Sequence, residues 1–456
     1  MHPNLVVILI DDLRFDEFGV GSHPYMQTPH IDRLAHEGAL FTQAFHTTPL
    51  CSPNRAAILT GQYASRHGII DNVGRDAASH RLPNYTQVVQ QRGYETAHIG
   101  KWHMGNDASP RPGYDTWISF PGQGKLVNPA LFENGALRQV QGYVTDLLNE
   151  RTVAFIEKPR QQPFSLFLAH KAVHPDLFQA QDGTIDLTSL GGYIAAERHR
   201  DLYRDGYFPP RPNVLPPEQV VQQKPAWREA FRLKADARSQ TLLRSVHAGT
   251  QEEIRCRAAM MASVDEGVGM LLAALERQGT LDNTFIVFLG DNGYFFGEHA
   301  LGPERRFAYE EGIRCPFVVR YPPLIAPGTV VSELVLALDI APTLIELAGG
   351  TPGPHIQGKS LLPLLAGTAR DWRTSFLIEY YGESAMPWLV AMTYKAVRTA
   401  HYKFIHWVHH DGCDELYDLR HDPYEMRNLI HDPGYGAVHA ELRRELAQLV
   451  AASVGL

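Results

Sequence analysis

Short apolar runs recur along the chain and predict strands that are buried on both faces. They cover residues 5–10, 96–99, 164–169 and 285–289. Continuous runs of this kind are typical of the parallel strands at the centre of a sheet. Helical patterns lie between and around them, at residues 28–37, 55–60, 85–92, 145–157 and 252–278. Strands that alternate with helices predict an α/β fold: a large mixed, mostly parallel sheet sandwiched by helices.

The pattern changes toward the C-terminus. Antiparallel strands are predicted at residues 375–381, 391–399 and 402–408, and an amphipathic helix at 438–452. We therefore expect a large domain over residues 1–368 and a smaller α+β subdomain, an antiparallel sheet plus a helix, over residues 369–456. Residues 176–250 are rich in Arg, Gln and Pro, and we expect them to form an excursion over one face of the large sheet.

Composition narrows the classes of function. The 456 residues carry a net charge of −8, which excludes a broad basic surface for nucleic acid but allows a local cationic pocket. Cys51, Cys256, Cys315 and Cys413 lie far apart without a CxxC spacing. We therefore expect neither a disulfide scaffold nor a cysteine zinc site, and a reducing compartment suits the chain.

Membrane and export signals are weak in the sequence. No run approaches the roughly 18 apolar residues of a membrane span, so we expect no membrane partner. About seven apolar residues precede the first aspartates, which is too few for a signal peptide. The expected location is cytoplasmic, or periplasmic or secreted if a leader has been removed.

Oxygen-bearing residues follow the first and the last of the four strands. Asp11 and Asp12 follow the first strand, and Asp291 and Asn292 follow the last. Such residues are common in turns and helix caps. However, the carboxyl ends of parallel strands meet at one edge of the sheet, where ligands bind. Together these side chains offer only oxygen ligands, which suit a hard divalent cation and not zinc or copper.

Cationic and imidazole groups follow the other two strands. Lys101 and His103 follow the second strand, and His170, Lys171 and His174 follow the third. Such donors suit an anionic tetrahedral group, for example sulfate or phosphate. A metal site beside an anion pocket predicts the hydrolysis of a charged ester.

The segment PLCSPNRAAILTG at residues 49–61 contains a candidate nucleophile. Pro53 suits the start of a helix, which places Cys51 at the helix N-terminus. There the partial positive charge attracts anions and lowers the pKa of a thiol. The alternative is that Cys51 is a small core residue, which is how we interpret Cys256, Cys315 and Cys413.

This segment resembles the signature of the type I sulfatases of the alkaline-phosphatase-like superfamily. The match comprises the family's Cys-x-Pro-x-Arg core and its Leu-Thr-Gly extension, at Cys51, Pro53, Arg55, Leu59, Thr60 and Gly61. Further matches are the Asp-Asp strand end, GKWHMG at 100–105, GDNG at 290–293, YEEGIR at 309–314 and ELYDL at 415–419. The resemblance covers most of the chain and implies the fold and catalytic domain of a sulfuric ester hydrolase.

The resemblance also implies a modified nucleophile and a metal. Cys51 would be oxidised to formylglycine by a formylglycine-generating enzyme. One hydroxyl of the hydrated aldehyde would attack sulfur and expel the alcohol, and the second would let the sulfated intermediate collapse. The metal ligands would be Asp11, Asp12, the modified Cys51, Asp291 and Asn292, with Ca²⁺ expected and Mn²⁺ or Mg²⁺ as alternatives.

Further residues receive roles by the same resemblance. Arg55 would hold the formylglycine, and His103 would be the base for its second hydroxyl. His174 would, with Lys101, face the substrate and help protonate the leaving oxygen. Variable segments above a rigid site usually set specificity, so residues 176–250 and the C-terminal subdomain should select the alcohol.

One position departs from the family's pattern. Four residues before the tyrosine of YEEGIR the family usually has a lysine that touches the sulfate, and here that residue is Arg305. Its guanidinium is a planar fork, so we expect Arg305 to hold two terminal oxygens of the tetrahedral group. The alternative is that Arg305 points to solvent and that Arg306 or Lys171 takes its place.

Two other functions fit the same residues. One is the hydrolysis of phosphonate monoesters or phosphodiesters by a member of the same superfamily, with manganese in place of calcium. The other is a non-catalytic anion-binding protein whose Cys51 stays a thiol. For the sulfatase, the expected substrate is a small-molecule or saccharide sulfate ester, without nucleic acid or membrane as a partner.

Overall fold

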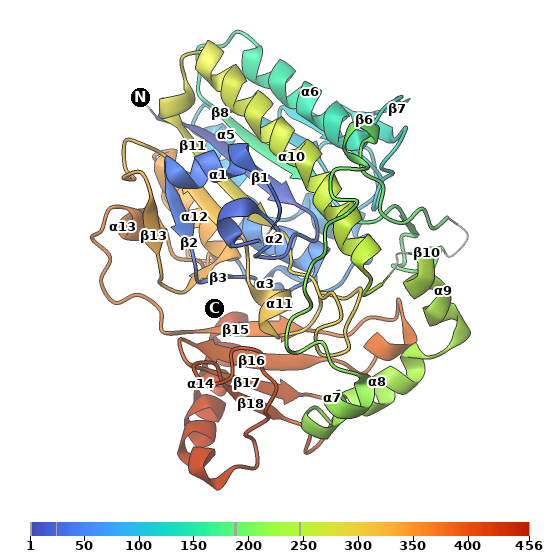
Figure 1. The fold of residues 1–456 in the computed structure, drawn as a ribbon. Coiled ribbons are helices and arrows are strands. Elements are labelled where there is room, and N and C mark those ends of the chain that lie inside the picture. The colour runs from blue at the N-terminus through green and yellow to red at the C-terminus, as the bar shows by residue number, and fades with distance from the viewer. Residues whose placement is uncertain (1, 24, 187–188, 246–247, 456) are drawn as a thin grey trace.

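A ten-stranded mixed sheet runs through the larger part of the protein (Figure 1). The computed structural model of the chain describes residues 2–23, 25–186, 189–245 and 248–455. In spatial order the strands are β13 (Thr329–Val331), β2 (Ala39–Phe41), β12 (Phe317–Arg320), β11 (Thr284–Gly290), β1 (Asn4–Ile10), β8 (Phe164–His170), β4 (Glu95–Gly100), β5 (Thr116–Ser119), β6 (Ala130–Glu133) and β7 (Ala136–Gln139). The five strands from β11 to β5 run parallel to one another, which confirms the mostly parallel sheet.

The four strands predicted from apolar runs are the central four, β11, β1, β8 and β4. Their register brings their carboxyl ends to one level, because Ile10 of β1 pairs with both Gly290 of β11 and His170 of β8. Gly100 at the end of β4 pairs with Ala169 of β8. The polar residues that follow these strands therefore start from neighbouring points on a single edge.

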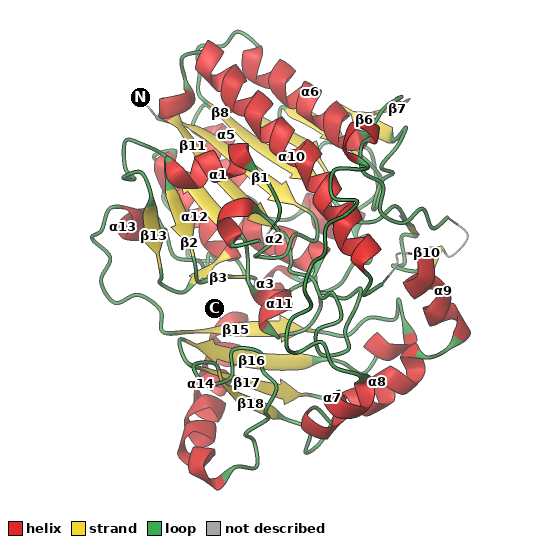
Figure 2. Cartoon of the chain, in the orientation of Figure 1, coloured by secondary structure: helices red, strands yellow, loops and turns green. Residues whose placement is uncertain are grey.

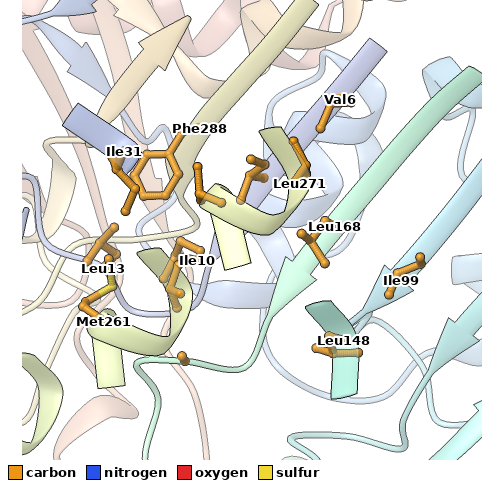
Figure 3. Packing of buried hydrophobic residues seen from close by; sticks show 14 of the residues in the cluster. Val6, Ile10, Leu13, Ile31, Ile99, Leu148, Leu168, Met261, Leu271 and Phe288 are labelled. Atoms are coloured by element: carbon orange, nitrogen blue, oxygen red, sulfur yellow. The ribbon is translucent and has the colours of Figure 1, made fainter. Parts of the chain in front are cut away.

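Helices cover both faces of this sheet (Figure 2). On one face, Val6 and Ile8 of β1 share a core with α1 (Pro29–His36), α6 (Val144–Glu157) and α10 (Gln251–Arg277) (Figure 3). On the other face, Leu5 and Val7 share a core with α2 (Cys51–Thr60), α5 (Tyr85–Gln91) and α12 (Ile340–Leu347). Successive strand residues point to opposite faces, so β1 is apolar throughout and anchors both layers.

Helix α10 has the length and hydropathy of a membrane-spanning helix, but 78% of its apolar window is buried inside the protein. It packs against α6 and α1, and its Met261 and Leu271 lie in the core beside Phe288 of β11 (Figure 3). The apolar character of α10 is that of a core helix.

A separate antiparallel sheet follows near the C-terminus (Figure 1). Its strands are β15 (Ser375–Tyr380), β16 (Tyr394–Thr399), β17 (Tyr402–Trp407) and β18 (Glu415–Asp418). Helix α14 (Gly436–Val454) covers one face, where Leu442 and Leu446 pack on Val397 and Phe404. This confirms the smaller α+β part; β18 was not expected, because four residues give too short a pattern.

The segment 176–250 crosses from the large sheet to the small one. It contains β9 (Phe178–Gln179), β10 (Ile185–Asp186), α7 (Pro217–Gln223), α8 (Trp227–Lys234) and α9 (Ala237–Ser245). The predicted excursion over one face of the large sheet is therefore only part of its path. Trp227 of α8 packs on Phe307 and Trp407, so its aromatic contacts draw α8 toward the C-terminal sheet.

The remaining elements are short. They are β3 (Ala44–Phe45), which pairs with β14 (Val335–Leu336), and the helices α3 (Ala64–His67), α4 (Asp76–His80), α11 (Glu310–Ile313) and α13 (Leu362–Leu365). Six 3₁₀ turns complete the described part: η1 (Gly19–Gly21), η2 (Glu197–His199), η3 (Leu281–Asn283), η4 (Ala337–Asp339), η5 (Pro387–Leu389) and η6 (Pro433–Tyr435).

Candidate active site

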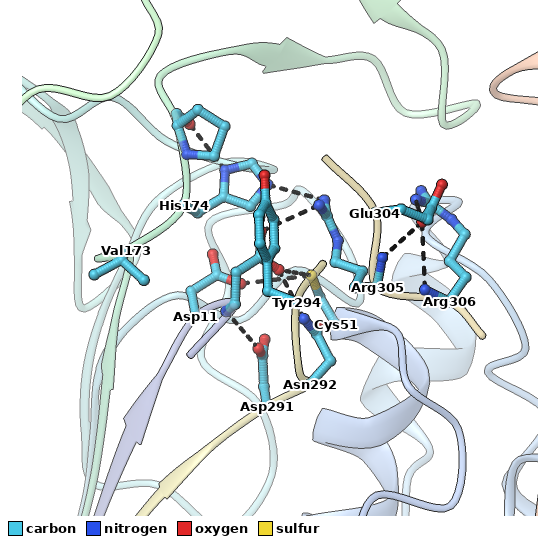
Figure 4. A network of polar contacts seen from close by, with 12 residues as sticks. Asp11, Cys51, Val173, His174, Asp291, Asn292, Tyr294, Glu304, Arg305 and Arg306 are labelled. Carbon is cyan, nitrogen blue, oxygen red and sulfur yellow. Dashed lines mark hydrogen bonds and ion pairs between the residues drawn. The ribbon is translucent and has the colours of Figure 1, made fainter. Parts of the chain in front are cut away.

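Three carboxylates and a thiol meet at the carboxyl ends of β1 and β11 (Figure 4). One ligand atom from each of Asp11, Asp12, Cys51 and Asp291 lies within 4.8 Å of the others, and all four residues are buried. The Cys51 Sγ lies 3.5 Å from Asp11 Oδ1 and 3.9 Å from Asp12 Oδ1. The backbone N–H of Asp12 donates to Asp291 Oδ1 at 2.9 Å, which ties the two strand ends together.

The predicted metal ligands fit a hard divalent cation. Asn292 Nδ2 donates to Asp12 Oδ1 at 2.8 Å. Within the described part of the chain, the buried Asn292 Oδ1 accepts no hydrogen bond. Calcium binds oxygen atoms at about 2.3–2.6 Å, so one ion can span ligand atoms that are nearly 5 Å apart. The donor set and the unpaired Asn292 Oδ1 therefore suit calcium, magnesium or manganese.

Cys51 is the first residue of α2, so the helix begins before the predicted residues 55–60. Arg55, one turn later, contacts the cage, as we call the cluster of Asp11, Asp12, Cys51, Asp291 and Asn292. Its Nε and Nη2 both lie 2.8 Å from Asp291 Oδ2, and its Nη1 donates to the backbone oxygen of Lys101 at 2.6 Å. Arg55 thus links α2 to the ends of β11 and β4.

Burial raises the pKa of the Cys51 thiol well above its ordinary value, and the carboxylates of Asp11, Asp291 and Asp12 raise it further against the opposing charge of Lys101. The expectation that the helix N-terminus lowers this pKa is wrong here, because burial and three carboxylates outweigh the helix end. Burial likewise raises the pKa of Asp11. The unmodified thiol is therefore protonated and a poor nucleophile.

Lys101 and Arg305 supply positive charge around the cage. Lys101 Nζ forms an ion pair with Asp11 Oδ2, and both side chains are fully buried. Arg305 Nη1 lies 3.1 Å from Asp12 Oδ2, and its Nη2 donates to His174 Nε2 at 3.3 Å (Figure 4). With Arg55, three cations face three carboxylates. A divalent cation and a sulfate dianion can join this set without changing its net charge.

The alternatives to Arg305 lie elsewhere. Arg306 forms ion pairs with Glu304 at 2.8 Å and with Glu383. Figure 4 shows the side chains of Arg306 and Glu304 on the other side of the backbone from the Arg305 side chain. Lys171 Nζ donates to the backbone oxygen of Pro175 at 3.0 Å. Arg305 is 9% exposed, so it points into the site and not to solvent.

Two histidines flank the cage as neutral rings. His174 Nδ1 lies 2.8 Å from the backbone oxygen of Pro175, so Nδ1 must carry a proton and Nε2 accepts from Arg305. His103 Nε2 lies 3.0 Å from Gln179 Oε1. Burial, with the charge of Lys101, lowers the pKa of both imidazoles well below the ordinary value. His170 is buried too, and burial lowers its pKa to about 4.

Two glutamines that the sequence analysis missed connect Lys101 with His103. Lys101 Nζ donates to Gln123 Oε1 at 2.6 Å, and Gln123 Nε2 donates to Gln179 Oε1 at 2.9 Å. Gln123 stands in the loop after β5, and Gln179 ends β9 in the segment 176–250. Neither position carries a periodic pattern or a strand-end signal that could have identified it.

The sequence analysis also missed a buried ion pair, between Arg257 of α10 and Glu17, that supports the backbone of the site. Asp12 and His103 have left-handed backbones, with φ of 58° and 67°, a conformation that needs support in residues other than glycine. Arg257 Nη2 donates to the backbone oxygen of Asp12 at 2.6 Å and pairs with Glu17 Oε2 at 2.5 Å. Ser52 Oγ donates to the backbone oxygen of His103 at 2.8 Å. These bonds hold the two strained residues.

Two family models together match nearly the whole chain. Residues 3–350 match the family model described as Sulfatase, and residues 297–452 match the model described as N-sulphoglucosamine sulphohydrolase, C-terminal. The N-acetylglucosamine-6-O-sulfatase of Bacteroides thetaiotaomicron is 30% identical, with 98% of this chain and 86% of that protein covered. The N-acetylglucosamine-6-sulfatase of Capra hircus is 26% identical, with 94% and 80% covered.

Solved structures share the fold. BT4656 in complex with its substrate D-glucosamine-2-N,6-O-disulfate superposes with a TM-score of 0.84 at 27% identity, covering 100% of this chain and 98% of that chain. The phosphonate monoester hydrolase of Agrobacterium radiobacter superposes with a TM-score of 0.77 at 22% identity, covering 99% and 96%. The second likeness is one of fold alone.

Proposed function

Because the chain belongs to the sulfatase family, we propose that this sulfatase hydrolyses a sulfate monoester of an amino sugar, with glucosamine 6-O-sulfate as the leading substrate class. The main support for this reaction is the position of Cys51. Its Sγ lies 3.5 Å from Asp11 Oδ1, among groups that suit a metal and a sulfate. The sugar follows from the two N-acetylglucosamine sulfatases and from the structure with a bound glucosamine disulfate.

The nucleophile is a formylglycine made from Cys51 by a formylglycine-generating enzyme. The raised pKa of the thiol supports this proposal, since a protonated thiol would be a poor nucleophile at neutral pH. The hydrated aldehyde supplies one hydroxyl to attack sulfur and a second whose deprotonation releases the sulfate. Arg55 lies one helical turn away and holds the first turn of α2 against Asp291.

The cage of Asp11, Asp12, Asp291, Asn292 and the modified residue 51 holds a divalent metal, with Ca²⁺ proposed. When bound, the metal polarises the sulfate and lowers the pKa of the attacking hydroxyl. The residues themselves keep the nucleophile, the metal position and the anion within one buried pocket. Low exposure strengthens each charge interaction there, because little water screens it.

Cationic side chains bind and orient the sulfate. Lys101 is held by Asp11, and Arg305 by Asp12, so both charges are fixed before the substrate arrives. Arg305 presents its fork to two terminal oxygens, and Lys101 approaches the leaving oxygen as a compact charge.

Two histidines move protons. His103 is neutral and accepts the proton of the second hydroxyl. His174 is neutral in the structure, with Nε2 accepting from Arg305. A bound anion favours its protonated form, which then assists Lys101 in protonating the leaving alcohol.

A side-by-side assay tests the proposal. Protein co-produced with a formylglycine-generating enzyme is given glucosamine 6-sulfate, an aryl sulfate and a phosphonate monoester, with Cys51→Ala as the control. We expect the highest kcat/KM on the sugar sulfate and no turnover by Cys51→Ala. Faster phosphonate hydrolysis would assign the alternative activity suggested by the shared fold. Tight sulfate binding without turnover of any ester would leave an anion-binding protein.

A further inference from the structure

Four polar side chains form one directed hydrogen-bond chain beside the cage. Lys101 Nζ contacts Gln123 Oε1 at 2.6 Å, Gln123 Nε2 contacts Gln179 Oε1 at 2.9 Å, and His103 Nε2 contacts the same Gln179 oxygen at 3.0 Å. Gln179 Nε2 donates to the backbone oxygen of Gly183 at 2.8 Å. Gln123, Gln179 and His103 are each at most 5% exposed, so water does not compete for these bonds.

The chemistry of the two ends fixes the direction of every bond. An ammonium group can only donate, so the Gln123 atom that faces Lys101 must be its carbonyl oxygen. A backbone carbonyl can only accept, so the Gln179 atom that faces Gly183 must be its NH₂ group. Both amide orientations follow from these two facts, and the oxygen of Gln179 therefore faces His103.

His103 is left with one tautomer. Because an oxygen faces Nε2 at 3.0 Å, Nε2 must carry the proton, and the lone pair of the neutral ring resides on Nδ1. Within the described residues, Nδ1 is buried and has no hydrogen-bond partner. We propose that Gln179, oriented through Gln123, is a positioning residue that fixes His103 as the Nε2–H tautomer and so leaves Nδ1 as the base.

This inference rests on the proposed function, in which His103 takes a proton from the second hydroxyl of the nucleophile. The low pKa of His103 keeps the ring neutral, so that the choice of tautomer decides whether a lone pair is present at the required nitrogen. Gln179 belongs to the β9–β10 hairpin of the segment 176–250. The segment expected to select the alcohol thus also sets the state of the base.

The decisive variant is Gln179→Met, which keeps the length of the side chain and removes the oxygen opposite Nε2. We expect kcat to fall by roughly tenfold to a hundredfold, which is less than the loss expected on removing a general base altogether, because only the choice of tautomer is disturbed. KM should change less than about threefold. Gln179→Glu retains an oxygen opposite Nε2 and should recover much of kcat. Gln181→Met is the matched control, because Gln181 lies on the same hairpin and its side chain, among the residues that the structure describes, binds Asp76 and not His103.

The tautomer itself is read from ¹⁵N spectra of histidine-labelled protein, with the signals of this ring identified by their loss in His103→Asn. The wild type and Gln179→Glu should show a protonated Nε2 and a bare Nδ1, and Gln179→Met should show a mixture. A bare Nε2 in the wild type, or unchanged kcat and tautomer in Gln179→Met, would overturn the inference. Absence of sulfatase activity in a wild type with the expected tautomer would instead overturn the proposed function.

Discussion

Replacing Arg305 by alanine tests how the anion is stabilised. The guanidinium lies 3.1 Å from Asp12 Oδ2 and 3.3 Å from His174 Nε2, and the residue is 9% exposed. Its charge is therefore fixed and poorly screened beside the cage, where we propose that the tetrahedral group binds and gains charge. The truncation removes this charge from the pocket.

The expected magnitude follows from comparable donors. Loss of one preorganised oxyanion donor lowers the rate by about 10²–10³-fold, or about 2.7–4 kcal/mol. We therefore expect kcat/KM of Arg305→Ala to fall by about 10²–10³. Arg305→Lys keeps the charge but loses the planar fork, so a smaller loss, on the order of tenfold, is expected.

Steady-state kinetics on one sulfate ester measures these values, with thermal unfolding as a check of folding. Arg306→Lys is the control, because Arg306 pairs with Glu304 and Glu383 and should affect the unfolding midpoint more than kcat/KM. An effect confined to Arg306, or a folded Arg305→Ala enzyme within about threefold of the wild type, would refute the reasoning.

Three further predictions concern the metal and a buried carboxyl. Chelation of divalent metal should abolish turnover and lower the free energy of unfolding. Added Ca²⁺ should restore turnover and raise the free energy of unfolding by about 2.7 kcal/mol when free Ca²⁺ is a hundredfold above its Kd. Calorimetry that shows no shift in the unfolding midpoint would contradict this. Asp291→Ala should lose turnover and bound metal and should remain folded with a lower unfolding midpoint, because buried Arg55 loses its partner. Metal analysis and circular dichroism can verify this, and a near-normal rate would count against the cage. Burial raises the pKa of Glu253 to about 7, so between pH 4.5 and 7 the folded state binds more protons than the unfolded state and the free energy of unfolding falls as pH rises, by about 3 kcal/mol. Glu253→Gln should flatten this fall in denaturant titrations, and an unchanged pH slope would disprove the assignment.

The centre of the fold and the strand-end residues could be predicted, because both depend on local patterns. Buried runs such as residues 5–10 can only be satisfied between two helical layers, and parallel register then brings Asp11 and Asp291 together. The strands near one edge of the large sheet could not be predicted in the same way. Strands β2 and β13 have three residues each, which is too few for a pattern.

The support of the site depends on tertiary contacts that leave no local signal. Gln123 and Gln179 are loop and hairpin residues, 56 positions apart, whose roles arise from their contacts with each other, with Lys101 and with His103. Arg257 is one of several charged residues on α10, and nothing local distinguishes it, because its partner Glu17 is 240 positions away. The pKa of Cys51 also depends on tertiary contacts, because burial and carboxylates that are distant in the sequence outweigh the effect of the local helix end.

Mass spectrometry of the peptide that carries Cys51 tests the central claim most directly. Protein made with a formylglycine-generating enzyme is digested, treated with a hydrazine probe and compared with its own activity on a sulfate ester. We expect the peptide to lack the thiol, to react with the probe, and to do so in proportion to kcat across preparations, while Cys51→Ala is inactive. A fully active preparation whose Cys51 remains an unmodified thiol would contradict the account.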